Sequence, residues 1–404
     1  MPATIQLGLE VALEHPPQAL RDARRFGLVC NQASVDGAFR HAAMLLHERF
    51  PGRLGALFGP QHGLWSTEQD NMVETAHDRD PRLGVPVHSL YSETRRPTPE
   101  MLDGLDLLVV DLQDVGTRVY TYAWTLVHCL EACAEAGVRV LVLDRPNPLG
   151  GEVAEGARLD PAFRSFVGLA SIPMRHGLTL GELGRHCNQA LGIGCALDVV
   201  PMRGFGRAQL WTDLDRAWLP PSPNLPRADG CFVYPGQVLL EGTNLSEGRG
   251  TTTPFEQCGA PWIDGFALAD AMRERGLEGC ALRPVAFEPT FQKWRGRRCG
   301  GVFVHVTEPR RLRSYRLTLS LLRCARELWP DRFAWNPPPY EYEETLLPID
   351  ILAGGSDVRR FVDGELSWDR LDALAAAPAD WWQEAGPSLL YGPQGPLDAA
   401  AEAR

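Results

Sequence analysis

The first two hundred residues alternate between two patterns of hydrophobic and polar positions. Short apolar runs, which are typical of buried strands, lie at 25–32, 53–59, 84–91, 106–114 and 138–148. Apolar residues at helical spacing lie at 41–50, 98–105, 123–137 and 177–192. This alternation predicts an α/β protein whose sheet is mostly parallel and carries helices on both faces, with the runs at 106–113 and 138–144 as parallel strands.

Residues at the ends of the expected helices support these boundaries. Thr98 precedes Pro99, a pairing that favours the start of a helix. Gly137 follows the third helical stretch and is a natural stop. Thr179 and Glu182 have the spacing of a capping box, so the fourth helix is expected to begin there.

The pattern changes after residue 192. Residues 201–230 are rich in Pro, Trp and Arg and resemble a long excursion or linker. Beyond it we expect helices near 265–276 and 314–328, a strand at 301–307 and a short helix in the tail. A chain of 404 residues exceeds what one hydrophobic core usually serves. The sequence therefore predicts one domain over residues 1–230 and a smaller α+β domain over residues 231–404.

Charge and cysteine content narrow the choice of partners and compartment. The formal net charge is −11, which argues against nucleic acid or an anionic membrane as a partner. The ten cysteines include no CxxC pair, and the N-terminus has neither the basic start nor the apolar run of a signal peptide. Free thiols without an export signal predict a cytoplasmic protein. The oligomeric state is left open.

Polar residues gather where the expected strands end. The run Leu54–Phe58 gives way to a loop that reads PQHGLWSTEQDNMVET, and similar polar loops follow the runs at 106–114 and 138–148. Because the carboxyl ends of parallel strands share one edge of the sheet, ligands bind there. The sequence therefore predicts a site built from several of these loops.

Several common kinds of site lack their sequence signatures. The chain has no GxGxxG after a strand, no phosphate-binding P-loop and no GxSxG turn, so we expect neither a nicotinamide cofactor nor a serine nucleophile. His62, Asp111, Asp114 and His176 can gather at one rim, but no HExxH or HxH motif accompanies them. We expect no catalytic metal, and a metal-dependent amidohydrolase remains an alternative.

Two carboxylates in these loops are candidates for acid–base chemistry. Glu74 and Glu155 each follow a strand at the expected ligand-binding edge. Glycoside hydrolysis uses two carboxyl groups that flank the scissile bond. A single loop glutamate is more often a solvated surface charge, but these two are expected beside a group of sugar-binding side chains. That group is His62, Trp65, Arg118, Tyr120 and Tyr122.

The densest polar segment of the second half reads EGTNLSEGRGTTTPFE, at residues 241–256. Glu241, Asn244 and Arg249 are its candidate binding residues. A solvated hairpin and the wall of a cleft between two domains are equally compatible with this composition.

Long motifs in this chain resemble a bacterial family. They are GPQHG, PVHSLY, VVDLQDVGTRVYTY, LDRPNPLGG, IPMRHGLTLGEL and YPGQVLLEGTNLSEGRGTTTPFE, and they span roughly residues 25–307. The resemblance is to the exo-β-N-acetylmuramidases, once described only as a domain of unknown function. It implies a Rossmann-like catalytic domain, a smaller C-terminal domain and an active cleft between them. The family motif usually reads PEHG, so Gln61 replaces a glutamate and is a poor acid or base.

The resemblance implies removal of terminal N-acetylmuramic acid from peptidoglycan fragments. Arg118 and Arg249 are then candidates for binding the lactyl carboxylate, His62 and Trp65 hold the ring, and Glu74 and Glu155 form the catalytic pair, with Glu155 favoured as the acid. A non-catalytic protein that binds sugars or peptidoglycan fragments remains an alternative. The remaining expected substrate contacts are Gln61, Asp114, Tyr120, His176, Glu241 and Asn244.

Overall fold

The computed structural model describes residues 4–70 and 73–393, and its first domain is built on a seven-stranded sheet. All neighbouring strands of this sheet are parallel except the edge pair β3–β4. In order across the sheet, the strands are β3 (Asp78–Arg79), β4 (Pro86–Ser89), β2 (Leu54–Gly59), β1 (Phe26–Cys30), β5 (Leu107–Asp111), β6 (Arg139–Leu143) and β7 (Leu197–Val200). Strands β5 and β6 pair in parallel, which confirms the predicted α/β fold.

Helices cover both faces of this sheet. Alternate residues of the central strands point to opposite faces: Leu28 and Val109 contact the cluster under α1 to α3, whereas Val29 and Val110 contact the cluster under α5. The helices are α1 (Gly8–Glu14), α2 (Gln18–Asp22), α3 (Ala42–Arg49), α4 (Pro99–Leu102), α5 (Tyr122–Ala136) and α6 (Leu180–Ala190).

The predicted helix ends are confirmed. Thr179 and Glu182 form a reciprocal capping box at the start of α6, and Gly137 ends α5 with a left-handed φ of 68°. Thr98 caps α4, but this helix ends at Leu102, earlier than the predicted 98–105, because the backbone has already left the helical conformation at Asp103.

The second domain contains a three-stranded antiparallel sheet in the order β8 (Gln257–Ala260), β10 (Cys299–Val306) and β9 (Cys280–Phe287). The predicted helices near 265–276 and 314–328 and the strand at 301–307 are all present. Helix α7 was not predicted from the sequence and carries Pro235 in its interior. The helices are α7 (Ala228–Gln237), α8 (Gly265–Arg273), α9 (Ser314–Leu328), α10 (Pro348–Ala353), α11 (Asp357–Val362) and α12 (Leu371–Ala375).

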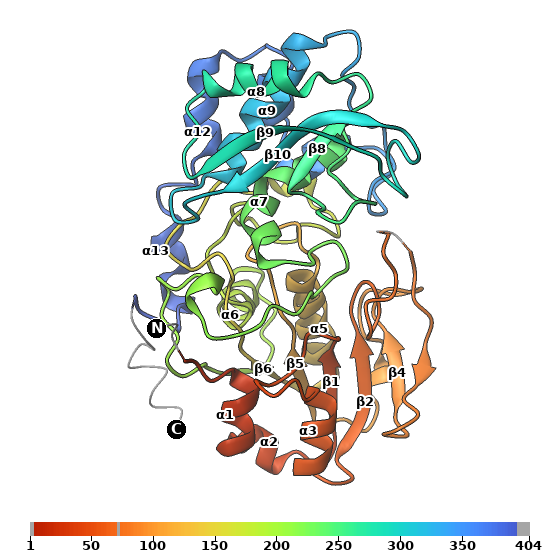
Figure 1. Cartoon of the computed structure of the whole chain (residues 1–404). Helices are drawn as coiled ribbons and strands as arrows, with labels where there is room; N and C mark the ends of the chain where they lie inside the picture. The colour runs from red at the N-terminus through yellow and green to blue at the C-terminus, as the bar shows by residue number, and fades with distance from the viewer. Residues whose placement is uncertain (1–3, 71–72, 394–404) are drawn as a thin grey trace.

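The chain finally returns to the first domain (Figure 1), although we predicted residues up to 404 as part of the second. Helix α13 (Trp381–Ala385) places Trp381 in a buried cluster with Trp124 and Leu183. Tyr391 donates a hydrogen bond of 2.7 Å to Oδ2 of Asp144, at the end of β6. Both ends of the described chain therefore build the first domain.

Short 3₁₀ segments join these elements. The 3₁₀ segments are Pro161–Phe163, Trp211–Asp213, Val238–Gly242, Trp368–Arg370 and Gly386–Ser388. Within residues 4–70 and 73–393, every helix is too short or too polar to span a bilayer.

Candidate active site

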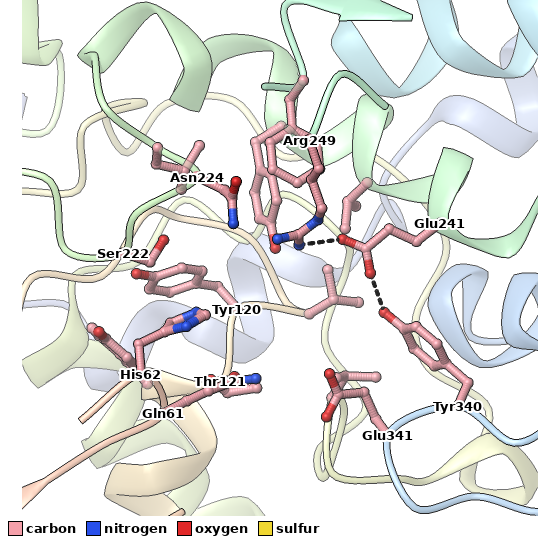
Figure 2. Close-up of a pocket in the computed structure, with 17 residues that line it drawn as sticks. Gln61, His62, Tyr120, Thr121, Ser222, Asn224, Glu241, Arg249, Tyr340 and Glu341 are labelled. Carbon is pink, nitrogen blue, oxygen red and sulfur yellow. Dashed lines mark hydrogen bonds and ion pairs between the residues drawn. The ribbon is translucent and has the colours of Figure 1, made fainter. Parts of the chain in front are cut away.

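A small cavity of about 40 Å³ lies between the two domains. Its walls come from loops of the first domain on one side and from two segments of the second domain on the other (Figure 2). The polar residues that line it are Gln61, His62, Tyr120, Thr121, Tyr122, Ser222, Asn224, Tyr234, Glu241, Arg249, Tyr340 and Glu341.

The loop after β2 supplies Gln61 and His62. His62 has a left-handed φ of 70°, and its Nδ1 lies 2.7 Å from the carbonyl oxygen of Glu68. A carbonyl only accepts, so Nδ1 carries the hydrogen and Nε2 presents a lone pair. Burial lowers the pKa of His62 to about 4, so the ring is neutral at physiological pH. Gln61 is oriented by Thr121, whose hydroxyl donates to its Oε1 at 2.6 Å.

The loop after β5 and the first residue of α5 supply a pair of tyrosines. The ring centroids of Tyr120 and Tyr122 are 4.7 Å apart. The Tyr122 hydroxyl donates at 2.6 Å to the carbonyl of Pro221, which also accepts from Asn31 at 2.7 Å. These bonds fasten the Pro-rich excursion to the ends of the strands, so the excursion forms a wall of the cavity and contributes Asn224.

The segment 241–256 forms the opposite wall and is not a solvated hairpin. Arg249 donates at 2.7 Å to Glu241, which also accepts at 2.6 Å from the Tyr340 hydroxyl (Figure 2). Burial disfavours the Arg249 cation, but Glu241 and Glu247 together raise its pKa. Gly248 and Gly250 flank Arg249 with φ of 81° and 79°, and a Cβ on either would lie 2.7 Å from neighbouring backbone atoms.

Glu341 is the second carboxylate that lines the cavity. It is 4 % exposed and accepts a hydrogen bond of 3.0 Å from the Tyr91 hydroxyl. In Figure 2 the side chains of Glu341 and Glu241 both lie on the opposite side of the cavity from His62, and Glu241 is the one joined to Arg249 and Tyr340. The cavity therefore contains two carboxylates and a neutral imidazole.

The predicted carboxylate pair is located elsewhere. The Glu74 side chain is 53 % exposed and lies 3.4 Å from Arg95. Glu155 is buried, forms an ion pair of 2.9 Å with Arg175 and accepts from the backbone N–H of Tyr315 at 3.2 Å. Neither lines the cavity, and the Glu155 contacts join the first domain to helix α9.

Arg118 also lies outside the cavity. Its guanidinium is fully buried and donates to the carbonyls of Ala157, Ile172 and Leu352, each at 2.9 Å. Burial lowers its pKa to about 10. These bonds occupy the guanidinium with the backbone, so the prediction that it binds a substrate carboxylate is not supported by its position.

Four more residues that we predicted as substrate contacts do not line the cavity. Asp114 and His176 are buried together, with Oδ2 and Nε2 3.7 Å apart. Burial raises the pKa of Asp114 to about 7 and lowers that of His176 to about 3. Trp65 packs on His41 and is 56 % exposed. Asn244 donates to the carbonyl of Arg332 at 2.8 Å and so supports the second domain.

The predicted residues that the structure does bring together in the cavity are Gln61, His62, Tyr120, Tyr122, Glu241 and Arg249. Sequence reasoning missed Tyr340 and Glu341, although the run PPPYEYEE at 337–344 concentrates prolines, tyrosines and glutamates. It also missed Asn224, which lies in the equally distinctive run PPSPNLP at 220–226.

The metal-ligand set considered from the sequence does not assemble. Arg145 holds both carboxylate oxygens of Asp111, at 2.5 and 2.9 Å. Across the described ranges, no group of three or more His, Cys, Asp and Glu side chains is arranged to hold a metal ion.

Two carboxylates that line one pocket are the kind of site that glycosidases use. Residues 26–229 match the family model of the N-terminal domain of the exo-β-N-acetylmuramidase NamZ, and residues 232–391 match the model of its C-terminal domain. The chain therefore belongs to the exo-β-N-acetylmuramidase NamZ family, and it is a glycosidase. This confirms the resemblance predicted from its motifs.

Individual relatives agree with this assignment. The peptidoglycan β-N-acetylmuramidase NamZ of Bacillus subtilis is 41 % identical over 367 residues, which cover 91 % of this chain and 86 % of the relative. Two crystal structures of DUF1343 family proteins from Bacteroides fragilis share the fold. Their TM-scores are 0.84 and 0.72 and their identities 31 % and 27 %, and each match covers 96 % of this chain and 99 % of the other.

Proposed function

We propose that the interdomain cavity hydrolyses the bond between a terminal β-linked N-acetylmuramic acid and the rest of a peptidoglycan fragment. The observation that carries this proposal is that Glu241 and Glu341 line the same cavity, together with the neutral His62. Two carboxyl groups are the usual requirement for protonating the leaving oxygen and assisting attack at the anomeric carbon.

Arg249 is the group that we assign to the lactyl carboxylate. It is the one Arg or Lys side chain among the described residues that line the cavity. In the free protein its charge is shared with Glu241 at 2.7 Å and Glu247 at 3.4 Å. A substrate carboxylate at Arg249 draws part of this charge away from Glu241.

Glu241 then acts as the general acid. Its proton goes to the glycosidic oxygen as the bond from that oxygen to the anomeric carbon breaks, and Tyr340 continues to orient the carboxyl group. Glu341 receives a proton from the water molecule whose oxygen bonds to the anomeric carbon, so one water is consumed for each N-acetylmuramic acid released. The Nε2 lone pair of His62 accepts a hydrogen bond from a hydroxyl of the sugar, because the ring is neutral and Nδ1 is held by Glu68.

Turnover of a chromogenic β-N-acetylmuramide tests these roles. Glu241→Gln and Glu341→Gln are each expected to lower kcat by about 10² or more, because each removes a proton-transfer group. Glu74→Gln and Glu155→Gln are the matched controls from outside the cavity, and folded protein of either is expected to keep kcat within about threefold. Loss of turnover in the controls but not in the cavity variants would show that Glu74 and Glu155 are the catalytic carboxylates, as predicted from the sequence. Addition of EDTA is expected to leave the rate unchanged.

We also propose a cytoplasmic location. All ten cysteines are free thiols and nine of them are buried, which suits a reducing compartment. Fractionation of cells that produce the natural protein tests this, and recovery of the enzyme outside the cytoplasmic membrane would contradict it.

A further inference from the structure

A cluster of aromatic and cationic side chains adjoins the cavity on the side of Glu341. The Arg95 guanidinium carbon lies 3.9 Å from the ring centroid of Tyr342 and 4.8 Å from that of Tyr91. The two tyrosine rings are 6.2 Å apart in an edge-to-face arrangement. Arg95 also contacts Glu74 at 3.4 Å, so the exposed carboxylate of the opening loop helps to hold this cluster. Tyr342 is therefore held in position by several neighbours.

The cluster is connected directly to the cavity. Tyr91 donates its hydroxyl hydrogen to Glu341, and Tyr342 is the next residue in the chain. Glu341 and Tyr342 both have left-handed φ values, of 45° and 69°. Consecutive non-glycine residues adopt this conformation only where their surroundings impose it. The strained backbone keeps Glu341 in the cavity and Tyr342 in solvent.

Tyr342 remains 50 % exposed in spite of these contacts. Single exposed aromatic residues are normal on protein surfaces, and Phe266, at 72 %, is one that lies on α8. Tyr342 differs because a cation already orders its ring beside a carboxylate of the cavity. A fixed aromatic ring loses little entropy on binding and packs well against the apolar C–H face of a pyranose.

We propose that Tyr342 forms the subsite for the aglycone, the first pyranose on the leaving-group side of the scissile bond. In a peptidoglycan fragment this ring is an N-acetylhexosamine. Arg95 is a positioning residue for the Tyr342 ring. The proposal rests on the function proposed above, because it requires the muramic acid ring to occupy the cavity.

The test compares two substrates that differ in the aglycone. One is a disaccharide of N-acetylmuramic acid β-linked to N-acetylglucosamine, and the other is methyl β-N-acetylmuramide, which has no aglycone ring. Tyr342→Ala is expected to lower kcat/KM about 3- to 10-fold for the disaccharide, the usual value of an aromatic contact, and to leave the methyl glycoside unchanged. Tyr342→Phe keeps the ring and is expected to behave as the wild type. Phe266→Ala is the matched control for loss of an exposed aromatic ring.

Three results would overturn the proposal. Equal losses on both substrates would mean that the ring supports Glu341 and does not contact the aglycone. No loss on either would remove Tyr342 from the site. A disaccharide-specific loss in Trp65→Ala but not in Tyr342→Ala would place the subsite on Trp65. If the wild type cleaves neither substrate, the proposed function fails separately. Calorimetric binding of the disaccharide to wild type and Tyr342→Ala then decides the subsite, with weaker binding to the variant expected.

Discussion

Replacement of Arg118 by methionine tests whether this residue is structural. Methionine has a similar length but no charge and no donors. The change removes the three hydrogen bonds to Ala157, Ile172 and Leu352. Leu352 belongs to α10 of the second domain, so the loss falls on the contact between the domains.

The expected cost follows from two opposing terms. A hydrogen bond from a charged donor contributes about 1.5–3 kcal/mol, so three contribute roughly 5–9 kcal/mol. Against this, burial lowers the pKa of Arg118 to about 10, which corresponds to a cost of roughly 3 kcal/mol for keeping the buried charge. The difference predicts that Arg118→Met lowers the free energy of unfolding by roughly 2–6 kcal/mol.

Urea unfolding measures this change. Arg139→Met is the control, because Arg139 is 55 % exposed and pairs with Asp198 at the surface, and its loss is expected to cost less than about 1 kcal/mol. The selectivity for N-acetylmuramide over N-acetylglucosaminide is measured on folded protein and is expected to be unchanged. An Arg118→Met variant with normal stability and reduced selectivity would refute the structural role. It would indicate that Arg118 binds the substrate carboxylate, as predicted from the sequence.

Two further predictions concern titratable groups. Burial raises the pKa of Asp114 to about 7, above its unfolded value of about 3.9, so the folded state binds the proton more tightly and the stability of the wild type falls as pH rises through this window. Asp114→Asn, which resembles the neutral acid, is expected to be more stable than the wild type by roughly 2–4 kcal/mol at pH 8 and nearly equal to it at pH 4 in urea unfolding, and a pH-independent difference would contradict this. His62→Asn keeps a donor near the Glu68 carbonyl but lacks Nε2, and we expect it to lower kcat/KM about 10-fold or more. His62→Gln places an amide oxygen or nitrogen near the Nε2 position, so we expect a smaller loss of kcat/KM. Because burial lowers the pKa of His62 to about 4, the wild-type pH–rate profile should show no inflection from this ring between pH 5 and 8, and such an inflection that disappears in His62→Gln would show the assignment to be wrong.

The elements of the first domain could be predicted because each depends on local pattern. Buried parallel strands need apolar side chains on both faces, as β5 and β6 have, and the Thr179–Glu182 capping box depends on residues three apart. Helix α7 could not be predicted in this way. Pro235 and the glycines around it disfavour a helix, and packing against α9 in the second domain stabilises it.

The candidate site was predicted in part. The loops after β2 and β5 follow strands at one sheet edge, so Gln61, His62 and Tyr120 were expected together and lie together. Glu74 and Glu155 met the same criterion but take other directions. A position in a loop does not determine the direction of its side chain. Glu155 points away from the cavity and forms an ion pair with Arg175.

The sequence by itself determined the parallel sheet, the chemical character of its carboxyl edge and, through long motifs, the family. These properties depend on the order of residues within short segments and on composition. The tertiary structure alone decided which carboxylates face the cavity. Glu241 and Glu341 are one hundred residues apart, and only the packing of the second domain against the first brings them together with His62. The same packing buries Arg118 and Glu155. A buried charge needs hydrogen-bonding partners, and only the tertiary structure determines which partners lie within reach.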